Sequence, residues 1–327
     1  MNHAVPSRRA VLAALGGGAV AAASTRAGFA QAWPDRPVRI VVAFTPGGSI
    51  DAFARALAPH FQTRFGQPFV VENRPGAGGT MATDQVARSA PDGYTLTVHS
   101  STIASMGPVL KSDFDASVNL TPVAMIARGP VAVLVPKDSP AKTIKDLVEQ
   151  SKADPGKLLY GSAGIGSTNH LQTELFNKRA GTSLKHVPYK GISQALQDLG
   201  GGRLHALFGS LGSAAGLMQS GHLRVIAYAG DERAPGYPDA PSIRSAGIDY
   251  EVSIWWGFFA PPGLPADIRN KLHETINAAL RDPAFLKLVE TAGAVAAPMS
   301  TEQFAGVVKK EVAETREVVE AAKIVFE

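Results

Sequence analysis

Residues 39–66 read RIVVAFTPGGSIDAFARALAPHFQTRFG, and this stretch decides the fold class. The apolar, β-branched residues over 38–44 predict a buried strand, which is followed by Gly47 and Gly48. An apolar residue then recurs at every fourth position over 50–65, which is typical of a helix that packs one face on a core. A strand that passes through a short loop directly into a helix is the repeating unit of α/β proteins, in which helices cover a mostly parallel sheet.

The same alternation continues along the chain and divides it into two units. Strands predicted over 68–74 and 94–100 complete a first α/β unit. A second series of strand, Gly/Ser-rich loop and helix follows, and the helices that close the chain lack strands of their own. We therefore expect the closing helices to pack back on the first unit. This predicts one lobe formed by residues 33–135 and 250–327, and a second lobe of residues 136–249 inserted into it.

The N-terminus has the pattern of an export signal. Arg8 and Arg9 precede a short apolar stretch rich in Ala and Gly, and small residues follow. The paired arginines are typical of twin-arginine signals. The apolar run is too short and too rich in Gly for a membrane helix. We expect residues 1–32 to be a signal peptide, cleaved near Ala30 or Ala32, which places the mature chain in the periplasm.

Composition excludes several other classes of protein. The chain has no cysteine, so it has no disulfide framework and no cysteine for a lipid anchor. Without the three arginines of the predicted signal, 29 basic residues face 28 acidic ones. A net charge near zero and the lack of a basic cluster give no indication of nucleic-acid binding.

Three loops between a strand and a helix share one design. TPGGSID (45–51), RPGAGGT (74–80) and GSAGIGSTNH (161–170) combine small residues with neutral hydrogen-bond donors. Small residues let the backbone approach a ligand, and the first turn of a helix offers unpaired N–H groups that favour an anion. Each loop alone is better explained as a simple connection between a strand and a helix. Three together predict a neutral anion site at the carboxyl ends of the strands.

An exported enzyme is the competing interpretation. The chain carries neither a dinucleotide fingerprint nor a phosphate-binding loop nor a nucleophile elbow. His170 and Glu174 are four residues apart, but the sequence offers no obvious third metal ligand. Ser49 or Ser167, held within about 3 Å of His99 or His170, would favour a hydrolase. No cofactor is expected.

Six stretches in order identify a family. WPDRPVRIVVAFTPGGSID, GQPFVVENRPGAGG, PDGYTLTVHSS, GSAGIGSTNHLQTELF, HVPYKGISQALQDL and WWGFFAPPGLP closely resemble the extracytoplasmic solute receptors of tripartite tricarboxylate transporters, also called Bug or TctC proteins. The resemblance runs from Trp33 almost to the C-terminus. It implies a type II periplasmic-binding-protein fold, with two α/β lobes, a two-strand hinge and a cleft between the lobes.

The resemblance also implies a function and a site. Such receptors bind a small carboxylate and deliver it to an inner-membrane permease; a sensory role, presenting the ligand to a signalling partner, stays open. We expect this chain to act as a monomer. One carboxylate is bound by backbone amides of two loops of the first lobe, and the second lobe closes over the ligand. The binding residues expected here are Phe44, Pro46, Gly47, Gly48, Ser49, Asp51, Ala77, Gly78, Gly79, Ser100, Ser101, Ser162, Gly164, Gly166, Ser167, Thr168, Asn169, His170, Gly209 and Ser210.

One departure from the family bears on the ligand. Many members carry an acidic residue directly after a Leu-Phe pair, where it meets a ligand amino group. Here Gly209 and Ser210 follow Leu207 and Phe208. An amino-acid ligand is therefore disfavoured relative to a di- or tricarboxylate or an aromatic acid, for which one ring of the Trp255-Trp256 pair is a possible partner.

Overall fold

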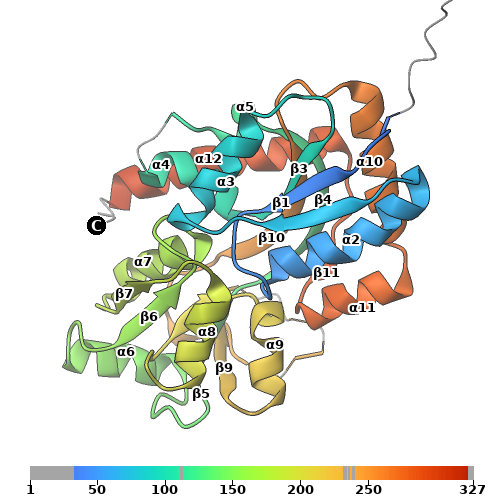
Figure 1. Cartoon of the computed structure of the whole chain (residues 1–327). Helices are drawn as coiled ribbons and strands as arrows, with labels where there is room; N and C mark the ends of the chain where they lie inside the picture. The colour runs from blue at the N-terminus through green and yellow to red at the C-terminus, as the bar shows by residue number, and fades with distance from the viewer. Residues whose placement is uncertain (1–32, 111–112, 231–233, 235, 238–239, 323–327) are drawn as a thin grey trace, which may run out of the picture.

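The computed structural model describes residues 33–110, 113–230, 234, 236–237 and 240–322. The predicted signal peptide, residues 1–32, lies outside these ranges. Figure 1 shows an α/β molecule of two lobes, each with its own sheet strands and flanking helices. Among the helices of the described ranges, none combines the length and the hydropathy needed to cross a bilayer.

The first lobe contains a six-stranded sheet. Its spatial order is β11 (Val295–Ala296), β4 (Thr121–Pro130), β10 (Ser253–Ala260), β3 (Thr95–Ser100), β1 (Val38–Val42) and β2 (Phe69–Asn73). The strand β1 is parallel to both of its neighbours, whereas β10 and β4 run antiparallel to theirs. The expectation of a mostly parallel sheet therefore holds for β1, β2 and β3 but not for the whole sheet, because β10, which returns from the second lobe, runs opposite to both of its neighbours.

The second lobe has a smaller sheet in two hydrogen-bonded parts. The strand β5 (Ala132–Pro136) lies antiparallel between β8 (Leu207–Gly209) and β9 (Leu223–Tyr228). Next to them, β6 (Leu159–Ser162) pairs in parallel with β7 (Lys185–Pro188). A backbone bridge between Tyr160 and Ala206 links the two parts. The lobe thus has one twisted layer of strands, as an α/β unit requires.

Helices cover both sheets. The first lobe carries α2 (Ser49–Phe65), η1 (Ala77–Gly79), α3 (Thr80–Ala87), α4 (Thr102–Leu110), α5 (Ala116–Asn119), α10 (Ala266–Ala279), α11 (Pro283–Thr291) and α12 (Thr301–Ala322). The second carries α6 (Ile144–Ala153), α7 (Thr168–Ala180), α8 (Ile192–Gly200), α9 (Leu211–Gln219) and η2 (Ile243–Ala246). The helix α10 contacts α2 and β4, and α12 contacts α4, α5 and β4. One short strand, β11, does occur among the closing elements, contrary to the expectation that they contain none.

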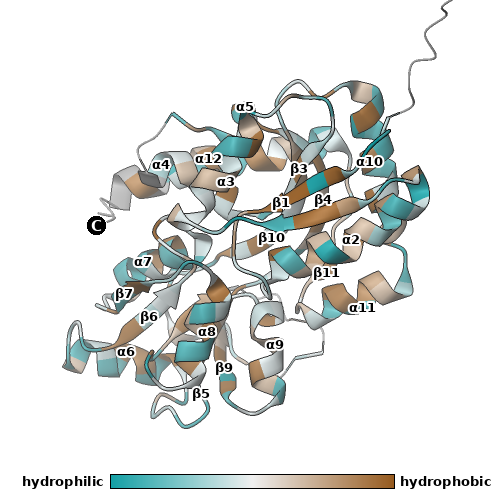
Figure 2. Ribbon diagram, viewed as in Figure 1, coloured by the Kyte–Doolittle hydropathy of each residue, from teal (hydrophilic) through white to brown (hydrophobic). Residues whose placement is uncertain are grey.

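Apolar strands form the centre of each lobe. Val38, Ile40 and Val42 of β1 are all fully buried, and Phe53 and Phe61 of α2 pack over the same sheet. Figure 2 shows hydrophobic residues concentrated in the strands and hydrophilic ones on the outward turns of the helices. This burial provides the stability of a chain that has no disulfide.

The chain passes between the lobes twice, at positions that face each other. Strand β4 ends at Pro130 in the large sheet, and β5 begins at Ala132 in the small one, with only the buried Val131 between them. On the return, residues 250–252 lead into β10, and the Val252 amide donates to the carbonyl of Ala229 in the second lobe. Two adjacent extended crossings form a hinge about which the lobes can rotate.

Candidate functional site

A cavity of about 50 Å³ lies where the two lobes meet, and its walls come from both of them. The lining residues are Phe44, Thr45, Gly48, Ser49, Ile50, Asp51, Ser100, Thr102, Ala163, Thr168, Asn169, Ile192, Ser210, Ser213, Ile254 and Trp256. Among these described residues none is a Lys or an Arg, and Asp51 is the one acidic member. We call this the neutral cavity.

Several helices begin at the neutral cavity. The first residues of α2, α4, α7 and α8 and the N-cap residue of α9 all line it: Ser49, Thr102, Thr168, Ile192 and Ser210. The first turn of a helix has N–H groups without intrahelical partners, and the helix dipole places partial positive charge there. Helix starts from both lobes therefore create a positive potential in a cavity without cationic side chains.

The loop between β1 and α2 is held in shape by its own hydrogen bonds. Gly47 adopts φ +90°, a conformation that favours glycine. Its amide donates to Asp51 Oδ2 at 3.1 Å. Asn73, at the end of β2, donates to the carbonyl of Phe44 at 3.1 Å. These contacts fix the direction of Gly48 and of the first turn of α2.

The Asp51 carboxylate accepts most of the hydrogen bonds that hold this loop. It accepts hydrogen bonds from Arg55 Nε at 3.0 Å and from Asn73 Nδ2 at 2.9 Å. Burial raises the pKa of Asp51, but the hydrogen bonds from Arg55, Asn73 and Gly47 outweigh it and hold the pKa below its usual value. The carboxylate is thus ionised and paired with Arg55. It positions the loop and is not a free acid.

The loop of η1 makes a close backbone approach to the second lobe. Ala77, Gly78 and Gly79 all have positive φ, at +47°, +63° and +94°. A Cβ on Gly78 would lie 2.1 Å from the carbonyl oxygen of Ile165 in the second lobe. These three residues do not line the neutral cavity. Because Gly78 has no side chain, the backbone of this loop can touch the backbone at Ile165 when the lobes close. We call this the glycine contact.

The loop between β6 and α7 is braced by two histidines. The Ser162 hydroxyl lies 2.6 Å from His186 Nε2, and the Gly166 amide donates to His170 Nδ1 at 3.1 Å. The two imidazoles stack with centroids 3.9 Å apart. Burial lowers the pKa of His170 to about 3 and that of His186 to about 4. Both rings are therefore neutral at physiological pH and serve to shape the loop.

Hydroxyl groups join the lobes directly at the cavity. Ser49 Oγ lies 2.8 Å from Ser210 Oγ and 2.9 Å from Ser213 Oγ. The Thr102 and Thr168 hydroxyls are also hydrogen-bonded to each other. Each pair combines one residue from each lobe, so these bonds exist only when the lobes are together. The structure is a closed form.

The end of β3 contributes both a lining residue and a packed histidine. Ser100 lines the neutral cavity and donates its amide to His99 Nδ1 at 3.0 Å. His99 is fully buried with its ring edge against Phe44, and burial lowers its pKa to about 4. His99 Nε2 has no partner among the described residues. His99 is therefore a packed neutral side chain and does not line the cavity.

The predicted site residues fall into two groups. Phe44, Gly48, Ser49, Asp51, Ser100, Thr168, Asn169 and Ser210 line the neutral cavity. Pro46, Gly47, Ala77, Gly78, Gly79, Ser101, Ser162, Gly164, Gly166, Ser167, His170 and Gly209 do not, and most of them belong to the loops that support it. The loop pattern located the region but does not distinguish lining from supporting residues.

Several lining residues were missed by sequence reasoning. Thr45, Ile50, Thr102, Ala163, Ile192, Ser213 and Ile254 also line the cavity. Of the tryptophan pair, Trp256 lines it and packs edge-on against Phe53. Trp255 lies on the other face of β10 and donates its Nε1–H to Glu311. The helix starts at Thr102 and Ile192 could have been found from the same strand-loop-helix signal.

The features expected of an enzyme or a metal centre are not assembled. Within the described part of the chain, neither Ser49 nor Ser167 is hydrogen-bonded to His99 or His170. Glu174 instead accepts from the Tyr160 hydroxyl at 2.5 Å. No group of three or more His, Asp or Glu side chains in the described ranges could hold a metal ion. The one Ser–His pair at these loops, Ser162 with His186, is formed by a serine that is fully buried and does not line the neutral cavity. The arrangement can bind an anion, and the pairs expected of a hydrolase are not formed among the described residues.

Comparisons with known proteins point the same way. The sequence pattern of the "Tripartite tricarboxylate transporter family receptor" matches residues 53–324. The periplasmic binding protein BugD is 31% identical with a TM-score of 0.84, over 89% of this chain and 99% of that one. R. palustris Rpa4515, solved with adipate, is 34% identical with a TM-score of 0.84, over 90% and 99%. MatC from Rhodopseudomonas palustris, with bound malate, is 31% identical with a TM-score of 0.84, over 88% and 100%.

Proposed function

Since the chain belongs to the tripartite tricarboxylate transporter receptor family, we propose that it is a periplasmic receptor for a small aliphatic carboxylate. The observation that carries this is the convergence of helix N-termini from both lobes on a cavity whose described lining contains no Lys or Arg. A carboxylate that receives several N–H and O–H hydrogen bonds gains about 1.5–3 kcal/mol from each. Micromolar affinity, about −8 kcal/mol, then needs only a few of them.

The ligand class follows from the size of the cavity and from the relatives. Similar structures hold adipate and malate, both small carboxylates. The cavity of about 50 Å³ in this closed form must widen to admit either diacid, and a bulkier acid requires more widening. Compact aliphatic diacids are therefore favoured over tricarboxylates and aromatic acids. Gly209 follows Phe208, so this position offers no carboxylate that could bind a ligand amino group.

The proposed mechanism is closure about the hinge. One carboxylate of the ligand binds first to the β1–α2 loop, and the groups of α7 and α9 reach it only when the lobes meet. The hydrogen bonds between Ser49 and Ser210 and between Thr102 and Thr168 form in the same step. Since the ligand has more contacts in the closed state, binding shifts the population toward it.

The proposal also covers export, oligomeric state and delivery of the ligand to the permease. We propose that residues 1–32 direct export and are cleaved near Ala30 or Ala32, and that the mature chain acts as a monomer. Its lobes correspond to residues 33–135 with 250–327, and 136–249, within a few residues at the hinge. The closed receptor delivers its ligand to the permease subunits of the transporter and performs no catalysis.

Titration calorimetry of the mature chain tests the binding function. The panel contains malate, succinate, adipate, citrate and benzoate, with the dimethyl ester of succinate as the uncharged control. We expect saturable binding of at least one diacid and no heat from the ester, since the helix starts recognise negative charge. Binding of the ester as strongly as of its parent acid, or no response to any acid, would contradict the proposal.

A further inference from the structure

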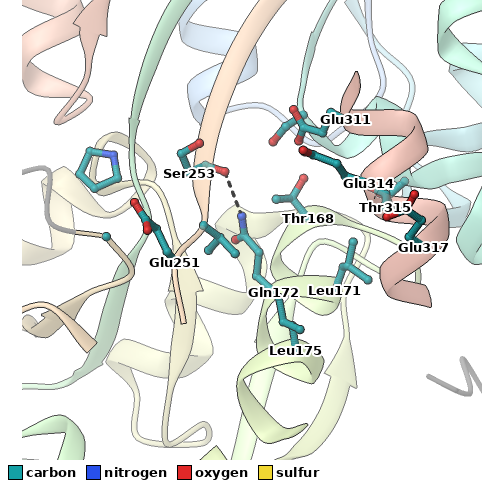
Figure 3. A pocket seen from close by; sticks show the side chains of 15 residues that line it. Thr168, Leu171, Gln172, Leu175, Glu251, Ser253, Glu311, Glu314, Thr315 and Glu317 are labelled. Carbon is teal, nitrogen blue, oxygen red and sulfur yellow. Dashed lines mark hydrogen bonds between the residues drawn. The ribbon is translucent and has the colours of Figure 1, made fainter. Parts of the chain in front are cut away.

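A second, larger cavity lies at the hinge and shares only Thr168 with the lining of the neutral cavity. Its volume is about 560 Å³. Figure 3 shows α12 on one side of it, α7 below it, and Glu251 and Ser253 on the strand that crosses between the lobes. It is lined by Ser101, Ser105, Pro130, Thr168, Leu171, Gln172, Leu175, Gly230, Glu251, Val252, Ser253, Glu311, Glu314, Thr315 and Glu317. We call it the acidic cavity.

Its charged lining is entirely acidic. Of the four glutamates, Glu251 pairs with Arg244 at 2.9 Å and Glu314 with Lys310 at 3.5 Å. Within the described residues, no Lys or Arg pairs with Glu311 or Glu317. Burial, together with the nearby charge of Glu314, raises the pKa of Glu311 to about 7. The hydrogen bond from Trp255 acts in the opposite direction and lowers this pKa in part. The cavity therefore holds more negative charge than its neighbouring cations compensate.

Two buried polar atoms in the lining also lack partners, which is the observation that points to a ligand. Gln172 is 5% exposed, and its Oε1 makes no hydrogen bond, although its Nε2 donates to the Ser253 carbonyl at 3.4 Å. In Figure 3 the Gln172 head group stands between Glu251 on one side and Glu311 and Glu314 on the other. Ser101, 3% exposed, likewise has an unpartnered hydroxyl. An unpartnered buried acceptor costs free energy that a donor from a ligand would recover.

The shape of the lining distinguishes an organic cation from a metal ion. No group of three or more acidic or histidine side chains in the described ranges could hold a metal. The volume is in the range of pockets that bind small organic molecules. Carboxylates stand at both ends, Glu251 at one and the α12 glutamates at the other, and the apolar side chains of Leu171 and Leu175 lie between and below them (Figure 3).

We propose that the acidic cavity binds an aliphatic diamine, with one ammonium group at Glu251 and Gln172 Oε1, the other at Glu311 and Glu317, and the alkyl chain over Leu171 and Leu175. Ammonium groups are donors only, which matches a lining whose charged groups are all carboxylates. The methylene chain explains why the floor is apolar. A monoamine fills one end alone and binds more weakly.

The position of this site couples it to the hinge. Glu311 and Glu317 lie on α12 of the first lobe, whereas Leu171 and Gln172 lie on α7 of the second. A diamine that spans both favours the lobe arrangement in which both ends are satisfied. Its affinity therefore changes when the lobes open, and by linkage the carboxylate and the diamine alter each other's affinity by the same factor.

Calorimetry with 1,4-diaminobutane tests the site directly. We expect saturable binding, about tenfold weaker binding of 1-aminobutane, and no binding of 1,4-butanediol, which has a similar shape but no charge. Glu317→Gln should weaken diamine binding at least tenfold, and because this residue is exposed on a helix the variant should fold. Glu290→Gln makes the same change of charge on α11, outside the cavity, and should leave binding intact.

The outcomes separate this site from the carboxylate site. In a Gly48→Asp variant, which blocks the neutral cavity, diamine binding should persist, so that failure of the carboxylate proposal leaves this test valid. The inference would be overturned by the absence of a diamine signal, by equal binding of butanediol, or by an equal loss in Glu290→Gln and Glu317→Gln. The last result would mean that net charge, and not the cavity, attracts the amine.

Discussion

The neutral cavity and the acidic cavity lie on the same hinge yet have opposite electrostatics. Helix starts converge on the first, and its one carboxylate, Asp51, is paired with Arg55. The second is bordered by the sides of two helices, α7 and α12, and by a crossing strand, and its charges come from glutamates. The orientation of the helices therefore decides which charge each cavity favours. A receptor can recognise an anion with backbone groups while it presents carboxylates to solvent nearby.

Both cavities also depend on lobe closure, but in different ways. In the neutral cavity, closure brings hydroxyl groups and glycines of the two lobes into direct contact. In the acidic cavity, α7 and α12 face each other across open space of about 560 Å³. We expect substitutions in the first to affect closure strongly and those in the second mainly to affect charge.

The largest effect should come from placing a negative charge in the neutral cavity. Gly48→Asp puts a carboxylate at the start of α2, where the Cβ would lie 3.3 Å from the Ile192 side chain. Repulsion of the ligand carboxylate should weaken binding by about 3 kcal/mol, or roughly 100-fold in Kd. Gly48→Asn has nearly the same size without the charge and is the matched control in the same titration. If both variants lose the same affinity, the cause is steric and the electrostatic contrast between the cavities is wrong.

The next effect should come from the glycine contact between the lobes. Gly78→Ala places a methyl group 2.1 Å from the Ile165 carbonyl oxygen, so the closed state must shift. We expect a loss of about 1–2 kcal/mol in ligand affinity, measured by calorimetry. Gly66→Ala is the control, because its φ of +73° is equally unfavourable for alanine but nothing lies within 4 Å of the new atom. It should lower the thermal stability and leave Kd unchanged.

The charge of the acidic cavity should appear in the pH dependence of stability. The pKa of Glu311 is raised from 4.5 to about 7, so its stabilising contribution is complete below about pH 4.5 and is lost as the pH rises through about 7. Glu311→Gln keeps an acceptor for Trp255 but cannot ionise. Relative to the parent chain, the variant should gain about 1–2 kcal/mol in unfolding free energy between pH 5 and pH 8. A difference that does not change with pH would mean that Glu311 is not buried enough to matter.

The two cavities also differ in how far they could be predicted from the sequence. The region of the neutral cavity was predicted because each loop carries its own signal, such as Gly47 and Gly48 before the first turn of α2. The acidic cavity was not predicted, because Glu251 and Glu311 are far apart in the chain and nothing in the local sequence distinguishes either one from an ordinary surface glutamate. Only the packing of α12 brings them to one space.

Within the neutral cavity, the residue that sequence reasoning overlooked is the most informative. Ser213 lies inside the first turn of α9, where a serine usually has only a local role. Here its hydroxyl accepts from the Ser49 amide at 3.2 Å and lies 2.9 Å from the Ser49 hydroxyl, so it joins the lobes. No local pattern shows that these two residues, 164 positions apart, will meet.

The smallest effect should therefore come from Ser213→Ala. The substitution removes one hydroxyl from the contact between the lobes but leaves the bond between Ser49 and Ser210. We expect a loss of about 1 kcal/mol, or roughly fivefold in Kd. The loss should be the same for malate and adipate, because the bond joins the lobes and its energy does not depend on the length of the ligand. Ser220→Ala, at the other end of α9, is the matched control, since that hydroxyl contacts Leu217 and His222 of its own lobe and lies outside the cavity. Equal affinities for the two variants would mean that the hydroxyl contact does not stabilise the closed state, and closure would then rest on the glycine contacts and the ligand alone.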